Sequence, residues 1–186
     1  MIRKIKQDEI ALLYPFVYRI LLDMELPLLK TVSGDTLNSI VNEAMESPNY
    51  RYGFEHAWVC EQDKQIVGVL FGYPGEFTSM VDGPFEVALI NHGLSPFEFK
   101  PGNETYPGEW YLDALVVAPI FRRKGIGRRM LQIIDNIAKD AGYYAIGLNC
   151  PIDNSVAYNL YKEVGFSEYT KHLLGEKIYY HMTKEL

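Results

Sequence analysis

Arg122-Arg123-Lys124-Gly125-Ile126-Gly127-Arg128 connects a strand-like apolar stretch to an amphipathic stretch with helical spacing. Residues 110–117, just upstream, are rich in β-branched and aromatic side chains, and Pro119 ends the run. Downstream, apolar residues recur every three to four positions until Gly142. The quoted segment is therefore predicted to be a turn that ends at the N-terminus of a helix.

Such a turn has the properties of an anion-binding site. The first N–H groups of a helix lack intrahelical partners, and the aligned peptide dipoles place partial positive charge there. Gly125 and Gly127 have no Cβ, so the backbone can approach a ligand closely. Long-range attraction would come from the basic side chains of Arg122, Arg123, Lys124 and Arg128. An ordinary surface turn with a solvated basic cluster is the alternative.

Two familiar phosphate loops do not fit this segment. The Walker loop requires Gly-Lys-Ser or Gly-Lys-Thr, which is absent. The dinucleotide fingerprint requires a third glycine, and Met130 occupies that position.

Two motifs in order resemble a known enzyme family. The first has Arg122, Gly125 and Gly127 after the strand segment Leu115-Val116-Val117-Ala118-Pro119. The second follows further along the chain, with Asn154, Ala157, Leu160-Tyr161 and Gly165-Phe166. Together they resemble the GNAT superfamily of acyl-CoA-dependent N-acetyltransferases, over about residues 110–166.

The resemblance implies an α+β fold in α/β/α layers, with a single mixed, mostly antiparallel sheet flanked by helices. Sequence patterns agree with this element order. Strands are expected at 1–6, 57–61, 65–73, 110–117, 144–150, 166–171 and 177–183. Helices are expected from a cap at Asp8, at 36–45, at 85–91, after the basic turn, and at 156–164. Pro15 should kink the first helix or shift its start.

Composition limits the other possibilities. A length of 186 residues suits one domain, 1–186, and 48% hydrophobic residues argue against disorder. The net charge of −6, without a long basic face, argues against nucleic acid and favours a cationic substrate. No apolar run approaches the ~20 residues of a membrane span, and the N-terminus lacks a signal-peptide core. A cytoplasmic protein without a membrane partner is expected.

Neither the cysteines nor the histidines suggest a metal site. Cys60 and Cys150 each lie in an apolar strand and are expected to be reduced core residues. The histidines have no zinc-ligand spacing: His56, His92, His172 and His181.

Residues 74–109 form an irregular insertion, longer than the ~12–15 residues usual for an unstructured connection. They contain apolar and aromatic residues, Phe77, Met80, Leu94, Phe97, Phe99 and Tyr106. They also contain carboxylates that suit a cationic acceptor: Glu76, Asp82, Glu86, Glu98, Glu104 and Glu109. The insertion is predicted to be a substrate lid, or alternatively to cover the sheet edge or form a homodimer contact.

The resemblance also assigns roles toward acetyl-CoA as cosubstrate. Residues 122–128, including Ile126, would bind the pyrophosphate, and the backbone of Leu115 and Val117 would pair with the pantetheine arm. A backbone N–H at Val116 or Leu115 would face the oxyanion. Asn154 would hydrogen-bond the CoA arm, unless it is only a helix cap.

Tyr161 matches the family's proton donor to the departing thiolate, and an ordinary core tyrosine is the alternative. The predicted base is Asp113, placed by strand alternation on one face with Tyr111 and Leu115. Glu109 is the second candidate, and its alternative is a solvated loop glutamate. Some members of the family deprotonate the amine through a chain of water molecules without a dedicated base, which would remove both candidates.

The predicted function is an N-acetyltransferase that transfers acetyl from acetyl-CoA to a primary amine of a small molecule or peptide. The reaction would be a direct attack through a tetrahedral intermediate. A catalytically idle acyl-CoA-binding sensor or scaffold is the alternative, and another acyl donor remains open.

Overall fold

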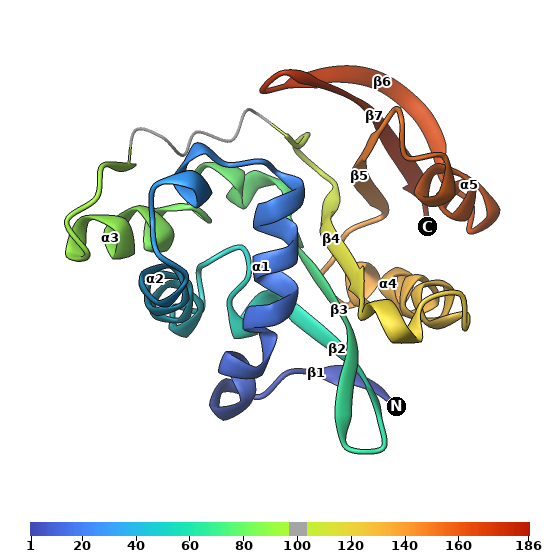
Figure 1. Cartoon of the computed structure of the whole chain (residues 1–186). Helices are drawn as coiled ribbons and strands as arrows, with labels where there is room; N and C mark the ends of the chain where they lie inside the picture. The colour runs from blue at the N-terminus through green and yellow to red at the C-terminus, as the bar shows by residue number, and fades with distance from the viewer. Residues whose placement is uncertain (97–103) are drawn as a thin grey trace.

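The computed structural model describes residues 1–96 and 104–186. Seven strands form one sheet in the order β1-β2-β3-β4-β5-β7-β6 (Figure 1). The strands are β1 (Ile2–Lys4), β2 (Ala57–Gln62), β3 (Gln65–Pro74), β4 (Trp110–Val117), β5 (Ala145–Pro151), β6 (Ser167–Leu174) and β7 (Lys177–Glu185). Among these described strands, β4 and β5 alone pair in parallel. The predicted mixed, mostly antiparallel sheet is confirmed.

Helices cover both faces of the sheet. On one face lie α1 (Tyr14–Asp23), α2 (Gly34–Glu46) and α3 (Gly83–Asn91), whose buried side chains share a core with β2 and β3. On the other face lie α4 (Ile126–Asp140) and α5 (Ser155–Glu163), over a second core that includes Trp110 and Phe166. The layers are therefore α/β/α, as expected. Within the described residues, no helix is long and apolar enough to cross a membrane.

The first helix begins later than the sequence suggested. A 3-10 turn, Gln7–Leu13, precedes α1, and Lys6 rather than Asp8 occupies its capping position. Pro15 lies in the first turn of α1. Proline lacks an N–H donor and is tolerated there because that N–H has no helical partner anyway. Of the two expected outcomes for Pro15, the shifted start is the one that occurs.

A two-residue hairpin connects β2 and β3, which the sequence placed at 57–61 and 65–73. Its two loop residues, Asp63 and Lys64, have φ values of 49° and 62°. Left-handed conformations at both positions give a turn whose twist matches that of the strands.

Strands β4 and β5 separate partway along their length. They pair only at Trp110↔Ile146, Tyr111↔Gly147 and Leu112↔Leu148. Beyond Leu112, β4 continues beside β3, while β5 continues beside β7. Among the described residues, nothing pairs with the β5-facing edge of β4 from residue 113 to 117. This opening is called the splay below.

A β-bulge lies at the start of the splay. Phe71 pairs with Ala114 and Gly72 pairs with Leu112, so Asp113 is an extra residue in β4. As a result, Asp113 and Tyr111 lie near Tyr73, whereas Leu115 packs into the core beneath α4. The prediction that Tyr111, Asp113 and Leu115 share one face was wrong, because the bulge resets the strand's alternation.

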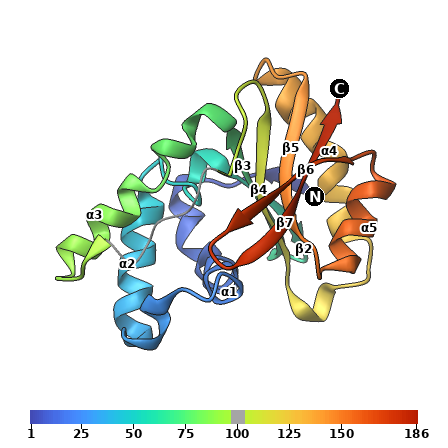
Figure 2. The same ribbon diagram turned by 90° about the horizontal axis from the view of Figure 1, so that it is seen from above.

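The insertion contains a 3-10 turn, Gly75–Ser79, and the expected helix, α3, which packs against α2. Phe97, Glu98 and Phe99 lie outside the described residues. On the far side of the splay, the β6–β7 hairpin extends toward the end of α1, where Lys177 pairs with Glu25 at 3.0 Å (Figure 2).

Candidate active site

The turn before α4 is built as the sequence predicted. Gly125 occupies the capping position with φ 75° and ψ 5°, a left-handed conformation that favours glycine. No side chain caps this end of α4 in the part of the chain that the structure describes. The first N–H groups of α4 are therefore open to a ligand, at the carboxyl end of β4.

The basic side chains of this turn have different partners. Arg122 donates from Nε to the Val117 carbonyl at 3.0 Å, which ties the turn to the end of β4. Arg128 forms an ion pair with Glu163, which joins α4 to α5. All of the turn's basic side chains are exposed, and Lys124 lies 5.1 Å from the Phe121 ring.

The backbone of β4 offers a free edge beside this turn. Leu115, Val116 and Val117 are half-buried, and their ladder partners on β3 are Leu70, Val69 and Gly68. In an antiparallel ladder, alternate residues direct N–H and C=O groups away from the partner strand. These groups of β4 face the splay.

Tyr161 lies on α5, on the same side of the sheet as α4. Its ring packs edge-on against the Phe166 ring, with the ring centroids 5.9 Å apart. Among the described residues the Tyr161 hydroxyl has no hydrogen-bond partner. Burial raises the pKa of Tyr161, with a smaller contribution from nearby Cys150. The phenol is therefore protonated at neutral pH, as a proton donor must be.

Asn154 caps a helix, which was the alternative to its predicted role toward CoA. Its Oδ1 accepts a hydrogen bond from the Ala157 N–H at 3.1 Å and so caps α5. No other side-chain bond of Asn154 is present within the described residues, so its amide nitrogen is free to donate to a ligand. A role toward CoA stays a prediction.

Asp113 is held by a buried arginine. Its Oδ2 accepts a hydrogen bond from the Tyr73 hydroxyl at 2.6 Å and lies 3.1 Å from Arg51 Nη1. Arg51 is 1% exposed. It also binds Asp82 through two nitrogens, at 2.7 and 3.1 Å, and lies 3.6 Å from Glu104. One guanidinium thus faces three carboxylates, here called the Arg51 cluster.

Glu109 is buried rather than solvated. Its Oε1 accepts from the Tyr106 N–H at 2.9 Å, and its Oε2 lies 3.0 Å from His181 Nε2. It sits over Gly147, where an added Cβ would clash with the carboxylate. The alternative of a solvated loop glutamate was therefore wrong.

A hydrogen-bonded row connects Glu109 to the Arg51 cluster. His181 Nδ1 lies 2.8 Å from Asn149 Oδ1, and Asn149 Nδ2 donates to the Tyr111 hydroxyl at 3.2 Å. The Tyr111 hydroxyl donates to Glu104 Oε2 at 3.3 Å. The sequence analysis missed Arg51, His181 and Asn149. For Asn149 the available signal was a single polar side chain in an apolar strand, because a buried polar group needs a partner; Arg51 and His181 had no such signal.

The model of the acetyltransferase (GNAT) family matches residues 26–166. The chain belongs to the GNAT acetyltransferase family. A crystal structure of an acetyltransferase is 36% identical, with a TM-score of 0.90, over 100% of this chain and 98% of the other.

Two curated relatives agree over shorter segments. GCN5-related N-acetyltransferase 4, chloroplastic, from Arabidopsis thaliana is 39% identical over 66 residues, 36% of this chain and 23% of that protein. Aminoglycoside N(6')-acetyltransferase type 1 from Acinetobacter genomosp. 13 is 28% identical over 82 residues, 44% of this chain and 55% of that protein. The matches span under a quarter of one relative and just over half of the other.

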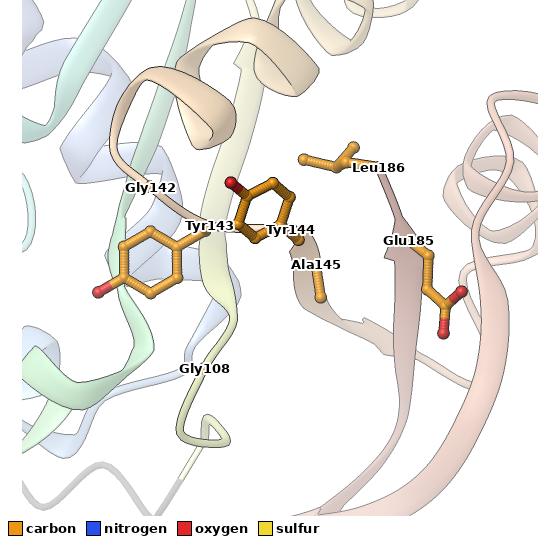
Figure 3. Close-up of a pocket in the computed structure, with 7 residues that line it drawn as sticks. All are labelled: Gly108, Gly142, Tyr143, Tyr144, Ala145, Glu185 and Leu186. Atoms are coloured by element: carbon orange, nitrogen blue, oxygen red, sulfur yellow. The ribbon is translucent and has the colours of Figure 1, made fainter.

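In this GNAT fold, an open hollow of about 490 Å³ lies away from the splay (Figure 3). It is at the amino ends of β4 and β5, whereas the turn before α4 follows the carboxyl end of β4. Its lining residues are Gly108, Gly142, Tyr143, Tyr144, Ala145, Glu185 and Leu186. None of the predicted site residues lines it, so the candidate active site of this GNAT protein is the splay.

Proposed function

We propose that this protein transfers an acetyl group from acetyl-CoA to a primary amine of a small molecule or peptide. The observation that carries the proposal is the splay itself. Strands β4 and β5 separate after Leu112 and Leu148, and the open N-terminus of α4 lies where β4 ends. A long, anionic, amide-bearing cosubstrate fits this combination of a free strand edge and a positive helix end.

Each part of the cosubstrate has a matching group. The turn 122–128 would hold the pyrophosphate through the α4 N–H groups and its exposed basic side chains. The backbone of Leu115 and Val117 would pair with the pantetheine amides, and the Val116 or Leu115 N–H would face the thioester oxygen. Asn154 Nδ2 would donate to the arm from the opposite side of the splay.

The acceptor nitrogen must lose two protons, and the thiolate must gain one. The acceptor ammonium first loses a proton, and the free amine attacks the thioester carbonyl carbon to give a tetrahedral intermediate. The C–S bond then breaks, Tyr161 protonates the departing thiolate, and the second proton lost by the nitrogen returns through water to the Tyr161 phenolate. Asp113 and Glu109 are the sequence's candidates for the first step, and both face away from α4.

A cationic acceptor is favoured by charge. The chain has a net charge of −6, and three carboxylates surround Arg51 close to the splay. The partial similarity to an aminoglycoside acetyltransferase points to the same class, an amine with several positive charges.

Calorimetry of acetyl-CoA and CoA binding to the purified protein tests the first half of the proposal. A thiol-release screen against polyamines, aminoglycosides, amino acids and peptides then tests the second half. Thiol release with one amine class would support the enzyme and identify its acceptor. Binding without release would favour the sensor or scaffold, and no binding would overturn the proposal. Succinyl-CoA as donor separates acetyl from other acyl transfer.

A further inference from the structure

Glu104 lies where β4 and β5 separate. Its backbone carbonyl accepts a hydrogen bond from Asn149 Nδ2 at 2.7 Å. Asn149 directly follows Leu148, the last β5 residue that pairs with β4. Through Asn149, Glu104 is therefore attached to the closed end of the splay. Glu104 belongs to the side of the sheet that carries Tyr111 and Arg51, opposite Tyr161 on α5.

The directions of the hydrogen bonds along the row determine that the Tyr111 hydroxyl donates to Glu104. Asn149 must direct its NH2 group at the Glu104 carbonyl, because a carbonyl only accepts. The same NH2 group donates to the Tyr111 hydroxyl, so the hydroxyl proton is directed at Glu104 Oε2. On its other side, Asn149 Oδ1 accepts from His181 Nδ1–H. Each member of the row is thereby fixed in one orientation, and the row ends on Glu104.

The three candidate carboxylates differ in how firmly they are held. Asp113 accepts two close donors, at 2.6 and 3.1 Å. Glu109 uses both oxygens, at 2.9 and 3.0 Å. Glu104 has two distant partners, at 3.3 and 3.6 Å, both on Oε2. Among the described residues its Oε1 has none. Glu104 is therefore the least firmly held of the three carboxylates, and its Oε1 is free to accept a proton from a ligand.

We propose that Glu104 accepts the proton that the acceptor ammonium loses before acetyl transfer. In this step an N–H bond of the ammonium breaks, its proton and Glu104 Oε1 form an O–H bond, and the amine keeps its electron pair. Glu104 is then a neutral acid, and bulk water takes the proton after product release. The proposal rests on the proposed function and adds a catalytic residue to it, with Tyr111, Asn149 and His181 as positioning residues.

The electrostatic surroundings support this role. Burial raises the pKa of Glu104, and the nearby carboxylates Asp113 and Asp82 raise it further, while Arg51 and the Tyr111 hydrogen bond oppose them. A base whose pKa is raised toward neutrality retains the proton of an ammonium more readily than an ordinary carboxylate does.

The test compares kcat against pH for the wild type, Glu104→Gln and Asp113→Asn. Glu46→Gln is the control, since Glu46 is exposed at the C-terminal end of α2 and, within the described residues, no hydrogen bond or ion pair joins it to the cluster. Glu104→Gln is expected to lower kcat by roughly 10²- to 10⁴-fold. It should also remove the fall in rate at low pH, while acetyl-CoA affinity measured by calorimetry stays within about twofold of the wild-type value.

Tyr111→Phe gives a second, independent readout. Loss of its hydrogen bond to the charged form raises the pKa of Glu104, so the acidic limb of the rate profile should move to higher pH. Glu104→Asp, which keeps the charge but withdraws the carboxylate, serves if Glu104→Gln does not fold, and it should also lower kcat.

Two results would overturn the role of Glu104 alone. One is an unchanged acidic limb in Glu104→Gln, and the other is its loss in Asp113→Asn only. Absence of thiol release from the wild type with every amine would overturn the proposed function itself.

Discussion

At the scale of single residues, Tyr161 and the Arg51 cluster place their functional groups on opposite sides of the sheet. Tyr161 comes from α5, whereas Glu104, Asp113 and Arg51 lie on the side of α1 and α2. A group bound in the splay would therefore meet a proton donor on one side and a proton acceptor on the other. This separation suits acyl transfer from a thioester to an amine, because protons leave the amine nitrogen while another reaches the thiolate sulfur.

Tyr161→Phe should keep CoA affinity but slow acetyl transfer by roughly ten- to a thousandfold, because the thiolate loses its proton donor. Thiol release followed over time measures the transfer rate, and calorimetry measures the CoA affinity. Tyr158→Phe is the matched control, since the Tyr158 hydroxyl donates to Glu168 on the outer hairpin. Equal rates for wild type and Tyr161→Phe would remove Tyr161 from the mechanism.

Gly147→Ala should destabilise the fold by about 1–3 kcal/mol, because its Cβ would displace the buried Glu109 carboxylate from His181. Urea unfolding measures the loss. Gly83→Ala is the control, since an added Cβ there meets nothing within 4 Å. If both variants unfold at the wild-type urea concentration, the close approach of Glu109 to β5 is wrong.

Local patterns predicted the turn but not the buried polar partners, and the role of Tyr161 came from the family motif and stays a prediction. Motif residues lie within a few positions of one another, so their spacing alone carries information. Arg51 and Asp82 are 31 residues apart, and Glu109 and His181 are 72 apart. Such pairs form only when segments far apart in the sequence meet in the fold, and periodicity within one segment does not record them.

At the scale of elements, the backbone conformation of Gly125 is the feature of the candidate site that most favours glycine. Gly125 before α4 and Gly142 after it both have positive φ, 75° and 87°, and an added Cβ at either meets nothing within 4 Å. They are therefore matched in backbone strain but lie at opposite ends of α4. Only Gly125 is beside the open helix N-terminus.

Gly125→Ala and Gly142→Ala should each cost about 1 kcal/mol of unfolding free energy. Only Gly125→Ala is expected to weaken CoA binding, by about tenfold or more, because the turn must hold both its conformation and a close ligand. Denaturant titration and calorimetry measure the pair. Equal CoA affinities in the two variants would contradict the assignment of the turn.

Element type was predicted more fully than element detail. The sequence patterns placed α2, α4 and α5 and the strands β2, β3, β6 and β7 correctly. The bulge at Asp113 was not predictable, because a bulge depends on the register of β4 against β3. One strand read alone shows only alternation, so Leu115 was assigned to the wrong face.

At the scale of the whole molecule, the Arg51 cluster joins parts of the chain with different roles. Arg51 follows α2, Asp82 precedes α3, and Asp113 is in β4. The insertion 74–109 is thus tied to the sheet beside the splay through Asp82 and Glu104. Part of the insertion therefore lies beside the splay, and the substrate lid, the cover over the sheet edge and the homodimer contact stay predictions.

The cluster also predicts how stability changes with pH. Burial raises the pKa of both Asp82 and Glu104. A carboxyl with a raised pKa binds its proton more tightly in the folded state, so its contribution to stability is full at low pH and is lost as pH rises through the raised value. Glu104→Gln should therefore be more stable than the wild type at pH 8 and no more stable near pH 4.

Urea unfolding of both proteins at the two pH values checks this. Glu46→Gln should show no such pH-dependent gain. If Glu104→Gln is instead less stable than the wild type at pH 8, the Glu104 charge stabilises the fold. The expected result would mean that the charge lowers stability, as functional groups often do.

The three residue pairs that hold β4 to β5 have a consequence for the free protein. They divide the sheet into two parts, β1–β4 and β5–β7, which are joined only through these pairs among the described residues. The backbone amides along the β5-facing edge of β4 are left without strand partners. Those amides should exchange with deuterium quickly in the free protein and slowly once CoA is bound. The cosubstrate would then act as an additional strand that pairs with the edge of β4. After its release, the two parts of the sheet would be free to open as separate units.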